Sequence, residues 1–281
     1  MKVLLVGGSS SLGKVLIPAL KGIAQVITAG RNNDDFYLDL EEITKPMSLP
    51  LGIDVVIHTA AHFGGKTSQE IIGAEKVNVL GTLRLCQASV QADVKHFIFI
   101  SSIYSQMNPQ SDYYSVYALS KKHAEEAAHF FCSQEEMPLT VLRPAQLYGN
   151  TNDFAKHQPF LYAMANKAES GEEITLYGKN DALRNFLHVD DFTQIILKVI
   201  QKKVTGVYSC QFVTDTSISA IAKAAISAFN SAAKVSFLED KGDIKSNIFP
   251  IEDALYQKIN FYPKVNIEDG MRMIAKNRIQ S

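Results

Sequence analysis

Apolar residues form two alternating kinds of run along the first half of the chain. Longer segments with apolar residues at helical spacing occupy about residues 11–21, 69–91 and 117–131. Short, nearly continuous apolar runs bounded by Gly, Ser or Pro separate them: VLLVG (3–7), QVITAG (25–30), DVVIHTA (54–60), HFIFISS (96–102) and LTVLRP (139–144). Such runs are typical of strands buried on both faces. The alternation predicts an α/β fold with a doubly wound parallel sheet, because parallel strands need helical crossovers.

The order of elements changes after Pro144. Helical patterns are then expected at about 154–167, 190–201, 217–229 and 266–277, and short strands at 173–178 and 206–210. We therefore expect a Rossmann-like dinucleotide-binding domain at 1–150, to which about 185–205 returns. A smaller mixed substrate-binding lobe should occupy 151–281.

Composition narrows the class of protein. The 281 residues are 46% hydrophobic and carry a net charge of −1, which suits a globular enzyme and argues against nucleic acid or anionic membranes as partners. No apolar run approaches the roughly 20 residues of a membrane span, and the N-terminal run is too short for a signal peptide. Cys86, Cys132 and Cys210 are far apart and include no CxxC, so we expect a reducing, cytoplasmic setting and no metal site.

A glycine-rich loop, G7-G-S-S-S-L-G13, joins the first strand to the first helix. Such a loop lets backbone N–H groups approach a pyrophosphate at a helix N-terminus. Ser10 stands where the middle glycine of a dinucleotide-binding loop would be, so it needs a negative φ or a wider turn. The alternative is a simple strand-to-helix turn, but the position at the head of a strand–helix series favours a dinucleotide.

The end of the second strand bears on which dinucleotide binds. An acidic residue there would bind a ribose 2′-hydroxyl and favour NAD. The strand instead ends in Thr28-Ala29-Gly30-Arg31, and the Arg31 guanidinium suits a 2′-phosphate. We therefore favour NADP. The alternatives are NAD as the cofactor and an Arg31 that is an ordinary solvated loop residue.

Tyr117 and Lys121 in YALSK lie four residues apart, on one face of a predicted helix. A phenol has a pKa of about 10, too high for proton transfer near neutrality. A neighbouring ammonium, together with the positive charge of a bound nicotinamide, should lower that pKa. On the pentapeptide alone, the favoured interpretation is an amphipathic helix with Tyr117 half buried and Lys121 paired to Glu125.

Together these segments resemble the extended short-chain dehydrogenase/reductases, the NAD(P)-dependent epimerase/dehydratase group that acts largely on nucleotide sugars. The resemblance covers most of the chain. It rests on segments in the same order as in the family: GGSSSLG (7–13), DL (39–40), HTAA (58–61), VNVLGTLRLCQA (77–88), FIFISS (97–102), YALSK (117–121), RPAQLYG (143–149) and RNFLHVDD (184–191).

The resemblance implies a role for each matching residue. Tyr117 would be the general acid/base, Lys121 would hold the nicotinamide ribose, and Ser102 would bind the reacting oxygen, with Ser101 structural. Substrate contacts are expected from His62, Ser102, Tyr104 and Arg184, the last at the diphosphate unless it is an ordinary surface residue. The cofactor-binding residues would be Gly7, Ser10, Leu12, Gly13, Arg31, Asp39, Leu40, Thr59, Ala60, Ala61, Asn78, Lys121 and Pro144.

The expected reaction is hydride transfer between the cofactor and a sugar carbon. Dehydratases of the family carry an Asp-Glu pair after the active-site Ser or Thr, whereas Ile103-Tyr104 stand here. Reduction of a keto-sugar or epimerisation is therefore favoured over dehydration. A cofactor-binding regulator and a reductase of a non-sugar ketone remain as alternatives. The family commonly forms homodimers, for which Leu80, Leu83, Ala127 and Phe130 could supply an apolar face or equally belong to the core.

Overall fold

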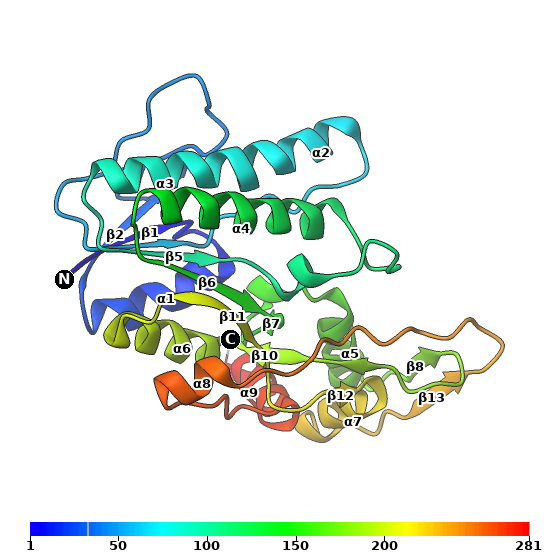
Figure 1. Cartoon of the computed structure of the whole chain (residues 1–281). Helices are drawn as coiled ribbons and strands as arrows, with labels where there is room; N and C mark the ends of the chain where they lie inside the picture. The colour runs from blue at the N-terminus through cyan, green and yellow to red at the C-terminus, as the bar shows by residue number, and fades with distance from the viewer. Residues whose placement is uncertain (33, 281) are drawn as a thin grey trace. The chain divides into compact units, whose positions relative to one another are not determined.

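A parallel β-sheet organises the first part of the molecule. The computed structural model describes residues 1–32 and 34–280, and within them seven strands form this sheet (Figure 1). In order across the sheet they are β3 (Phe36–Tyr37), β2 (Gln25–Gly30), β1 (Lys2–Val6), β4 (Val55–His58), β5 (His96–Ile100), β6 (Leu139–Pro144) and β11 (Gly206–Cys210). All neighbours are parallel, so the predicted doubly wound sheet is confirmed. The order reverses between β1 and β4, where ligands of such sheets bind.

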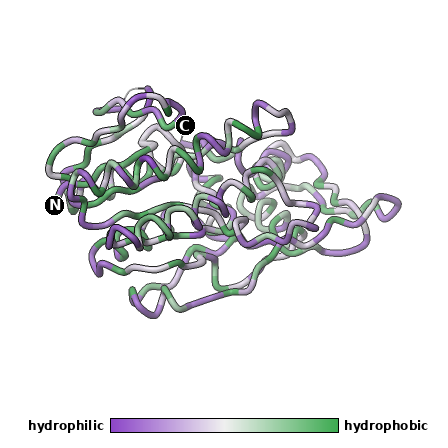
Figure 2. Tube along the Cα trace, turned by 45° about the horizontal axis from the view of Figure 1, so that its top comes forward, coloured by the Kyte–Doolittle hydropathy of each residue, from purple (hydrophilic) through white to green (hydrophobic). Residues whose placement is uncertain are grey.

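Helices cover both faces of this sheet. Figure 1 shows α3 (Gly81–Gln91) and α4 (Val116–Gln134) on one face, and α1 (Ser11–Lys21) and α6 (Val189–Lys202) on the other. Strands β4 and β5 are therefore buried at every position, as their unbroken apolar sequence predicts. In Figure 2 the helical turns carry hydrophobic and hydrophilic residues side by side, as expected of helices with one face on the core.

One predicted helix differs from a regular α-helix. The segment expected at 69–91 consists of α2 (Ser68–Glu75), a π-helical turn (η1, Lys76–Leu80) and α3. The π turn contains Asn78, which is buried. Wide turns of this kind are often found at functional sites.

The remaining elements are short strand pairs and helices. The strand pairs are β7 (Gln146–Tyr148) with β10 (Phe186–His188), β8 (Ile174–Tyr177) with β13 (Val235–Leu238), and β9 (Leu183–Arg184) with β12 (Thr216–Ser217). The helices are α5 (Pro159–Ser170), α7 (Ile218–Ala228), α8 (Ala254–Ile259) and α9 (Ile267–Gln280), with 3₁₀ turns at Ile103–Gln106 (η2) and Asn152–Phe154 (η3). Helix α7 packs against both α5 and α9.

The chain divides into two compact units. The first comprises Met1–Pro144, Thr193–Cys210 and Ala254–Ile259, and the second comprises Ala145–Phe192, Gln211–Asp253 and Asn260–Ser281. The sequence interpretation placed the boundary near residue 150, with about 185–205 as the only returning segment. The short α8 segment was not expected in the first unit, because six residues are too few for a recognisable helical pattern.

Candidate active site

The loop after β1 has the shape that close approach to a ligand requires. Gly7 has φ +92°, and a side chain there would come within 2.7 Å of Thr59 Oγ1 and 2.8 Å of the Ala60 nitrogen. A side chain at Gly13, in the first turn of α1, would come within 2.6 Å of the carbonyl oxygen of Gly8. Both glycines are therefore required by the close packing of this loop.

Ser10 fits this loop as its N-cap residue. Its φ is −68°, which meets the condition set by the sequence analysis, and its Oγ accepts a hydrogen bond of 2.9 Å from the Gly13 nitrogen. Leu12 is buried in the same turn. The first turn of α1 carries no acidic residue, so the partial positive charge of the helix N-terminus is not offset there.

An acidic residue that the sequence analysis missed lies beside the glycine loop. The Asp34 carboxyl group lies against Gly8 and Gly30, and its Oδ1 would be 2.8 Å from a side chain built at Gly8. Its Oδ2 is buried without a hydrogen-bond partner among residues 1–32 and 34–280, and burial raises the pKa of this carboxyl group. The sequence analysis looked for an acid only at the strand tip and therefore chose Arg31.

Hydrogen bonds made by the next residue, Asp35, hold Asp34 in this position. The Asp35 carboxylate accepts hydrogen bonds of 2.9 Å and 3.0 Å from the backbone nitrogen and hydroxyl of Thr28, which lower its pKa and turn the segment back over the end of β2. Arg31 is largely exposed, and its Nη1 lies 3.4 Å from Glu41 Oε2.

The other predicted cofactor-binding residues of the first unit follow β3, β4 and β6. Thr59 continues β4, and its hydroxyl donates a 2.9 Å hydrogen bond to the carbonyl of Val6. Ala60 and Ala61 follow it and are partly exposed. Leu40 is buried, Asp39 accepts a hydrogen bond from the backbone of Glu41 at 2.9 Å, and Pro144 ends β6.

The three predicted catalytic residues are brought together in the first unit. Ser115 caps the start of α4, so that Tyr117 lies in its first turn and Lys121 one turn later. Ser102 follows β5, and its side chain is hydrogen-bonded to the phenol of Tyr117. The Lys121 Nζ lies 6.0 Å from the centre of the Tyr117 ring and donates a 2.9 Å hydrogen bond to the carbonyl of Ile100.

The protonation of this group differs from the sequence expectation. Burial raises the pKa of Tyr117 to about 12, and the hydrogen bond with Ser102 opposes that rise only in part. Burial also lowers the pKa of Lys121 to about 7. The expectation of a lowered phenol pKa included the charge of a bound nicotinamide. Among the protein groups alone, removal from water dominates and raises the pKa.

The Asn78 side chain connects the loop after β4 to helix α4. Its Oδ1 accepts from the His62 nitrogen, and its Nδ2 donates to the His62 carbonyl, both at 2.8 Å. The same Nδ2 donates to Ser120 Oγ at 2.9 Å. Because both amide hydrogens are used in these bonds, the side chain positions His62 and the YALSK segment.

The predicted substrate residues His62 and Tyr104 are also in the first unit. The His62 Nδ1 accepts a 2.9 Å hydrogen bond from the Gly64 nitrogen. Tyr104 lies close enough to Tyr117 to raise its pKa. The exposed ring of Phe63 lies on the ring of Tyr117, so aromatic side chains surround the phenol.

Arg184 belongs to the second unit and is buried. Its Nη1 donates 2.8 Å hydrogen bonds to the carbonyls of Leu183 and Lys245. The alternative that Arg184 is an ordinary surface residue is therefore wrong. The guanidinium is held rigidly by backbone groups of the second unit.

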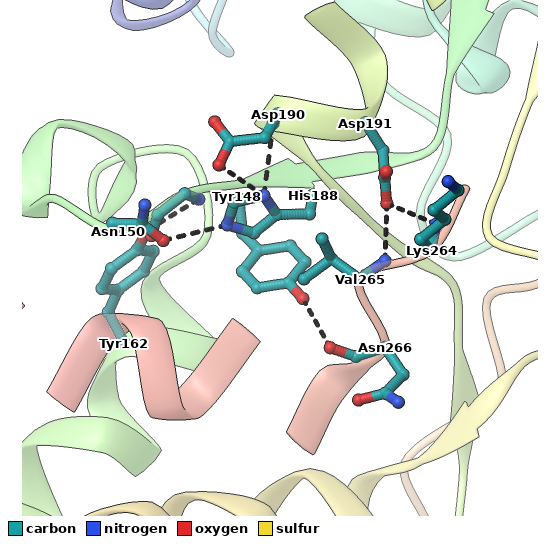
Figure 3. A network of polar contacts seen from close by, with 10 residues as sticks. Tyr148, Asn150, Tyr162, His188, Asp190, Asp191, Lys264, Val265 and Asn266 are labelled. Carbon is teal, nitrogen blue, oxygen red and sulfur yellow. Dashed lines mark hydrogen bonds and ion pairs between the residues drawn. The ribbon is translucent and has the colours of Figure 1, made fainter. Parts of the chain in front are cut away.

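The RPAQLYG and RNFLHVDD segments form one polar network in the second unit (Figure 3). Their strands β7 and β10 pair side by side, and the buried His188 Nε2 lies 3.0 Å from Asn150 Oδ1. Asp191 Oδ2 accepts hydrogen bonds of 2.8 Å from the nitrogens of Lys264 and Val265. Asp191 lies in the first turn of α6 and joins that helix to the segment that precedes α9, while His188 joins β10 to Asn150, so both side chains have structural roles.

Residues 1–32 and 34–280 contain no group of three or more His, Cys, Asp or Glu side chains arranged to hold a metal ion. In the same ranges no helix has the length and apolar character needed to cross a membrane.

Comparison with protein families gives a match over most of the chain. The model described as the NAD dependent epimerase/dehydratase family matches residues 3–210. Among curated proteins, the CDP-abequose synthase of Salmonella typhimurium is 25% identical over 214 residues, which cover 72% of this chain and 70% of that protein.

Solved structures show the same fold. The UDP-glucose 4-epimerase of Thermotoga maritima, solved with UDP-glucose, has a TM-score of 0.79 at 22% identity and covers 100% of this chain and 99% of its own. The RMD protein of Pseudomonas aeruginosa, solved with NADPH, has a TM-score of 0.77 at 20% identity and covers 98% and 96%.

Proposed function

Because the chain belongs to the NAD-dependent epimerase/dehydratase family, we propose that it is an oxidoreductase or epimerase that acts on a nucleotide sugar with Tyr117 as general acid/base. The observation that carries this proposal is the grouping of Ser102, Tyr117 and Lys121, with the Ser102–Tyr117 hydrogen bond and the buried ammonium next to the phenol. A chance amphipathic helix would not bury a lysine at 1% exposure.

Each residue of this group has a defined task in the proposed reaction. A bound nicotinamide would accept or supply the hydride. Tyr117 would take up or release the hydroxyl proton of the substrate, and Ser102 would donate a hydrogen bond to the reacting oxygen. Lys121 would bind the ribose. Because Tyr117 has a pKa of about 12 among protein groups alone, positive charge brought near it on binding would lower that pKa toward the working range.

The described residues fit a nicotinamide dinucleotide. The loop from Gly7 to Gly13 would hold the pyrophosphate, and the unpartnered Oδ2 of Asp34 would accept a hydrogen bond from a ribose hydroxyl. Asp39 and Leu40 would lie at the adenine, and Thr59, Ala60 and Ala61 beside the loop.

We propose NAD as the preferred cofactor. A 2′-phosphate near Asp34 would bring like charges together, whereas a ribose hydroxyl would satisfy the buried oxygen. The sequence-based preference for NADP rests on Arg31, whose guanidinium is shared with Glu41. The alternative is an NADP site built on Arg31. The ratio of the NAD affinity to the NADP affinity distinguishes the two.

Reduction of a keto-sugar or epimerisation fits the site better than dehydration. Ile103 and Tyr104 follow Ser102, so the acidic pair that a dehydratase needs is not present at these two positions. Arg184 would contact the diphosphate of the substrate through its guanidinium, for which its fixed orientation is suited. A non-sugar ketone would not need this arginine.

We also propose a homodimer formed through α2, the π turn and α4. Ile72, Leu80 and Phe130 expose apolar side chains on these elements, and large exposed apolar side chains mark interaction surfaces when they cluster. Light scattering after size exclusion tests this. A dimer that Phe130→Glu converts to a monomer supports the proposal, and a monomeric wild-type chain contradicts it.

A thermal-shift screen tests cofactor and substrate together. Ligands that bind only the folded protein raise the melting temperature, so NAD, NADP and a panel of UDP-, GDP-, dTDP- and CDP-sugars are compared with free ketones. Tyr117→Phe should abolish turnover of any substrate found while the cofactor shift persists. Retained turnover refutes the role of Tyr117, and cofactor binding without turnover of any compound supports a regulator.

A further inference from the structure

Glu125 is a buried acid that the proposed reaction does not use. It lies on α4 one turn after Lys121, and only 5% of it is exposed. A carboxylate removed from water is strongly destabilising unless charged and polar groups surround it. Its surroundings therefore show what it does.

Two residues hold the Glu125 carboxylate. Arg143 donates from Nε to Oε2 at 2.9 Å and from Nη2 to Oε2 at 2.5 Å, with a longer contact of 3.1 Å from Nε to Oε1. Ser101 donates from its hydroxyl to Oε1. The carboxylate is thus fixed by a guanidinium and a hydroxyl from two neighbouring strand ends.

Each member of this cluster is a neighbour of a predicted site residue, either directly in sequence or one helical turn away. Ser101 immediately precedes Ser102 at the end of β5, and Arg143 immediately precedes Pro144 at the end of β6. Glu125 follows Lys121 on α4. The cluster therefore joins the three elements that position the candidate catalytic residues.

The charges around Lys121 give Glu125 a second effect. On α4, Tyr117 is neutral because its pKa is about 12, and on β4 the fully buried His58 is neutral because burial lowers its pKa to about 3. From β5 the lysine meets only the Phe99 ring and the Ile100 carbonyl. The Arg143 charge on β6 is paired with Glu125.

Among the described groups, the Glu125 carboxylate stabilises the charged form of Lys121. Burial of the lysine destabilises that form. In the absence of that carboxylate the lysine would have only carbonyl and ring contacts in a dry environment. Because the pKa of Lys121 is about 7 even with Glu125 in place, the lysine would then lose its proton below neutral pH.

We propose that Glu125 is a positioning residue: braced by Arg143 and Ser101, it fixes Ser102 and α4 relative to each other and places a negative charge one helical turn from the Lys121 ammonium. This rests on the proposed function only for the claim that the charge serves catalysis. The sequence allowed a direct Lys121–Glu125 pair, whereas the carboxylate is bonded to Arg143 and Ser101 and acts on the lysine through space.

The test is an NMR titration of Lys121 in the free protein, with lysine labelled at Cε and Nζ and the signal assigned by its loss in Lys121→Met. Glu125→Gln keeps the shape and an oxygen for Ser101 but removes the charge. We expect the Lys121 midpoint to fall by roughly half to one pH unit. Ser101→Ala, which removes a hydrogen bond to the same carboxylate but no charge, is the matched control and should leave the midpoint unchanged.

Turnover supplies the second measurement. In Glu125→Gln the alkaline side of the pH profile should move to lower pH, so that activity relative to wild type falls more at pH 7 than at pH 6. A purely structural ion pair would lower the melting temperature of Glu125→Gln and leave the Lys121 midpoint in place, and that result would overturn the proposal.

A second variant covers the case in which Glu125→Gln does not fold because Arg143 is left unpaired. The double variant Glu125→Gln/Arg143→Met is compared with Arg143→Met alone, so that the two proteins differ by the Glu125 charge, and the double variant should have the lower Lys121 midpoint. Equal midpoints in these two variants also overturn the proposal. The titration needs no substrate, so inactivity of the wild-type protein on every nucleotide sugar would reject the proposed function and leave this result standing.

Discussion

The rings of Phe63 and Tyr117 are stacked, with centroids 4.9 Å apart and planes inclined by 17°. Phe63 is 54% exposed, so an aromatic ring in contact with solvent covers one face of the phenol assigned to proton transfer. It lies in the loop after β4, beside Gly64 with φ +74°. This arrangement shields Tyr117 from water and offers a flat apolar surface at the candidate substrate site.

Replacement of Phe63 by Ala should therefore affect the site more than the fold. Water would reach Tyr117, so the phenol pKa should fall below about 12, as measured by ultraviolet titration of the free protein. We expect KM for the substrate to rise about two- to twelvefold, since an aromatic contact contributes roughly 0.5–1.5 kcal/mol. Phe160→Ala, at another exposed phenylalanine, is the control. Equal kinetics in the two variants would show that Phe63 has no part in binding.

Asp34 should decide between the two cofactors. With its unpartnered Oδ2 beside Gly8 and Gly30, Asp34→Ser should weaken NAD about tenfold, the equivalent of one charge-assisted hydrogen bond, and reduce discrimination against NADP. Arg31→Ala should change NAD affinity little. Calorimetric titration of both cofactors measures these effects. If Arg31→Ala instead abolishes NADP binding and Asp34→Ser is neutral, the sequence-based choice of NADP is right.

The buried ammonium of Lys121 should make the protein less stable than it could be. Its pKa is about 7 when folded and 10.5 in a solvated chain. The unfolded chain therefore binds more protons between these values, and stability rises with pH across that window. Lys121→Met removes this effect, so it should raise the melting temperature below pH 7 by about 4–8 °C, for roughly 2 kcal/mol. The gain should vanish toward pH 10.

Scanning calorimetry at several pH values measures the Lys121→Met effect, and the exposed neighbour Lys122 provides the control. Lys122→Met should change the melting temperature little at any pH. A Lys121→Met variant that is less stable than wild type at pH 6 would show that the ammonium stabilises the fold.

Asn78 should be important to both stability and turnover. Asn78→Ala removes both hydrogen bonds to the His62 backbone and the one that Ser120 Oγ accepts, and unsatisfied buried polar groups cost about 1–3 kcal/mol. We expect a lower melting temperature and reduced kcat, because the loop after β4 and α4 are no longer held together. Asn108→Ala, at an exposed asparagine, should change neither. Normal kcat in a destabilised Asn78→Ala protein would restrict the residue to a role in folding.

Much of the sheet could be predicted because its strands are buried on both faces. HFIFISS and LTVLRP contain β5 and β6, since a buried strand needs apolar residues at nearly every position. QVITAG and GVYSC also coincide with strands, β2 and β11, although these are partly exposed. Strands of two or three residues, such as β9 and β12, carry no period to recognise. The predicted helix at 154–167 begins only at Pro159, because proline is favoured in the first turn of a helix.

The site could be predicted only where local spacing determines it. Tyr117 and Lys121 follow from helical geometry, and Ser102 from its place after a strand. Asp34 could not be found in this way, because its position depends on the Asp35–Thr28 bonds that turn the chain. The doublet Asp34-Asp35 shortly after a strand was the available signal. The pKa of Tyr117 depends on burial, which a pentapeptide does not reveal.

The π turn at Lys76–Leu80 determines where in this helical segment a relative can lose one residue. Its hydrogen bonds span one residue more than those of an α-helix, so the turn accommodates an extra residue while the helix continues in register. A homologue lacking a single residue in this stretch would close the turn into regular α-helix and keep Thr82 beside His58, which it contacts at 3.0 Å. The same loss within α3 would instead rotate everything downstream by about 100°. Single-residue deletions should therefore be tolerated at Lys76–Leu80 and rare in α3.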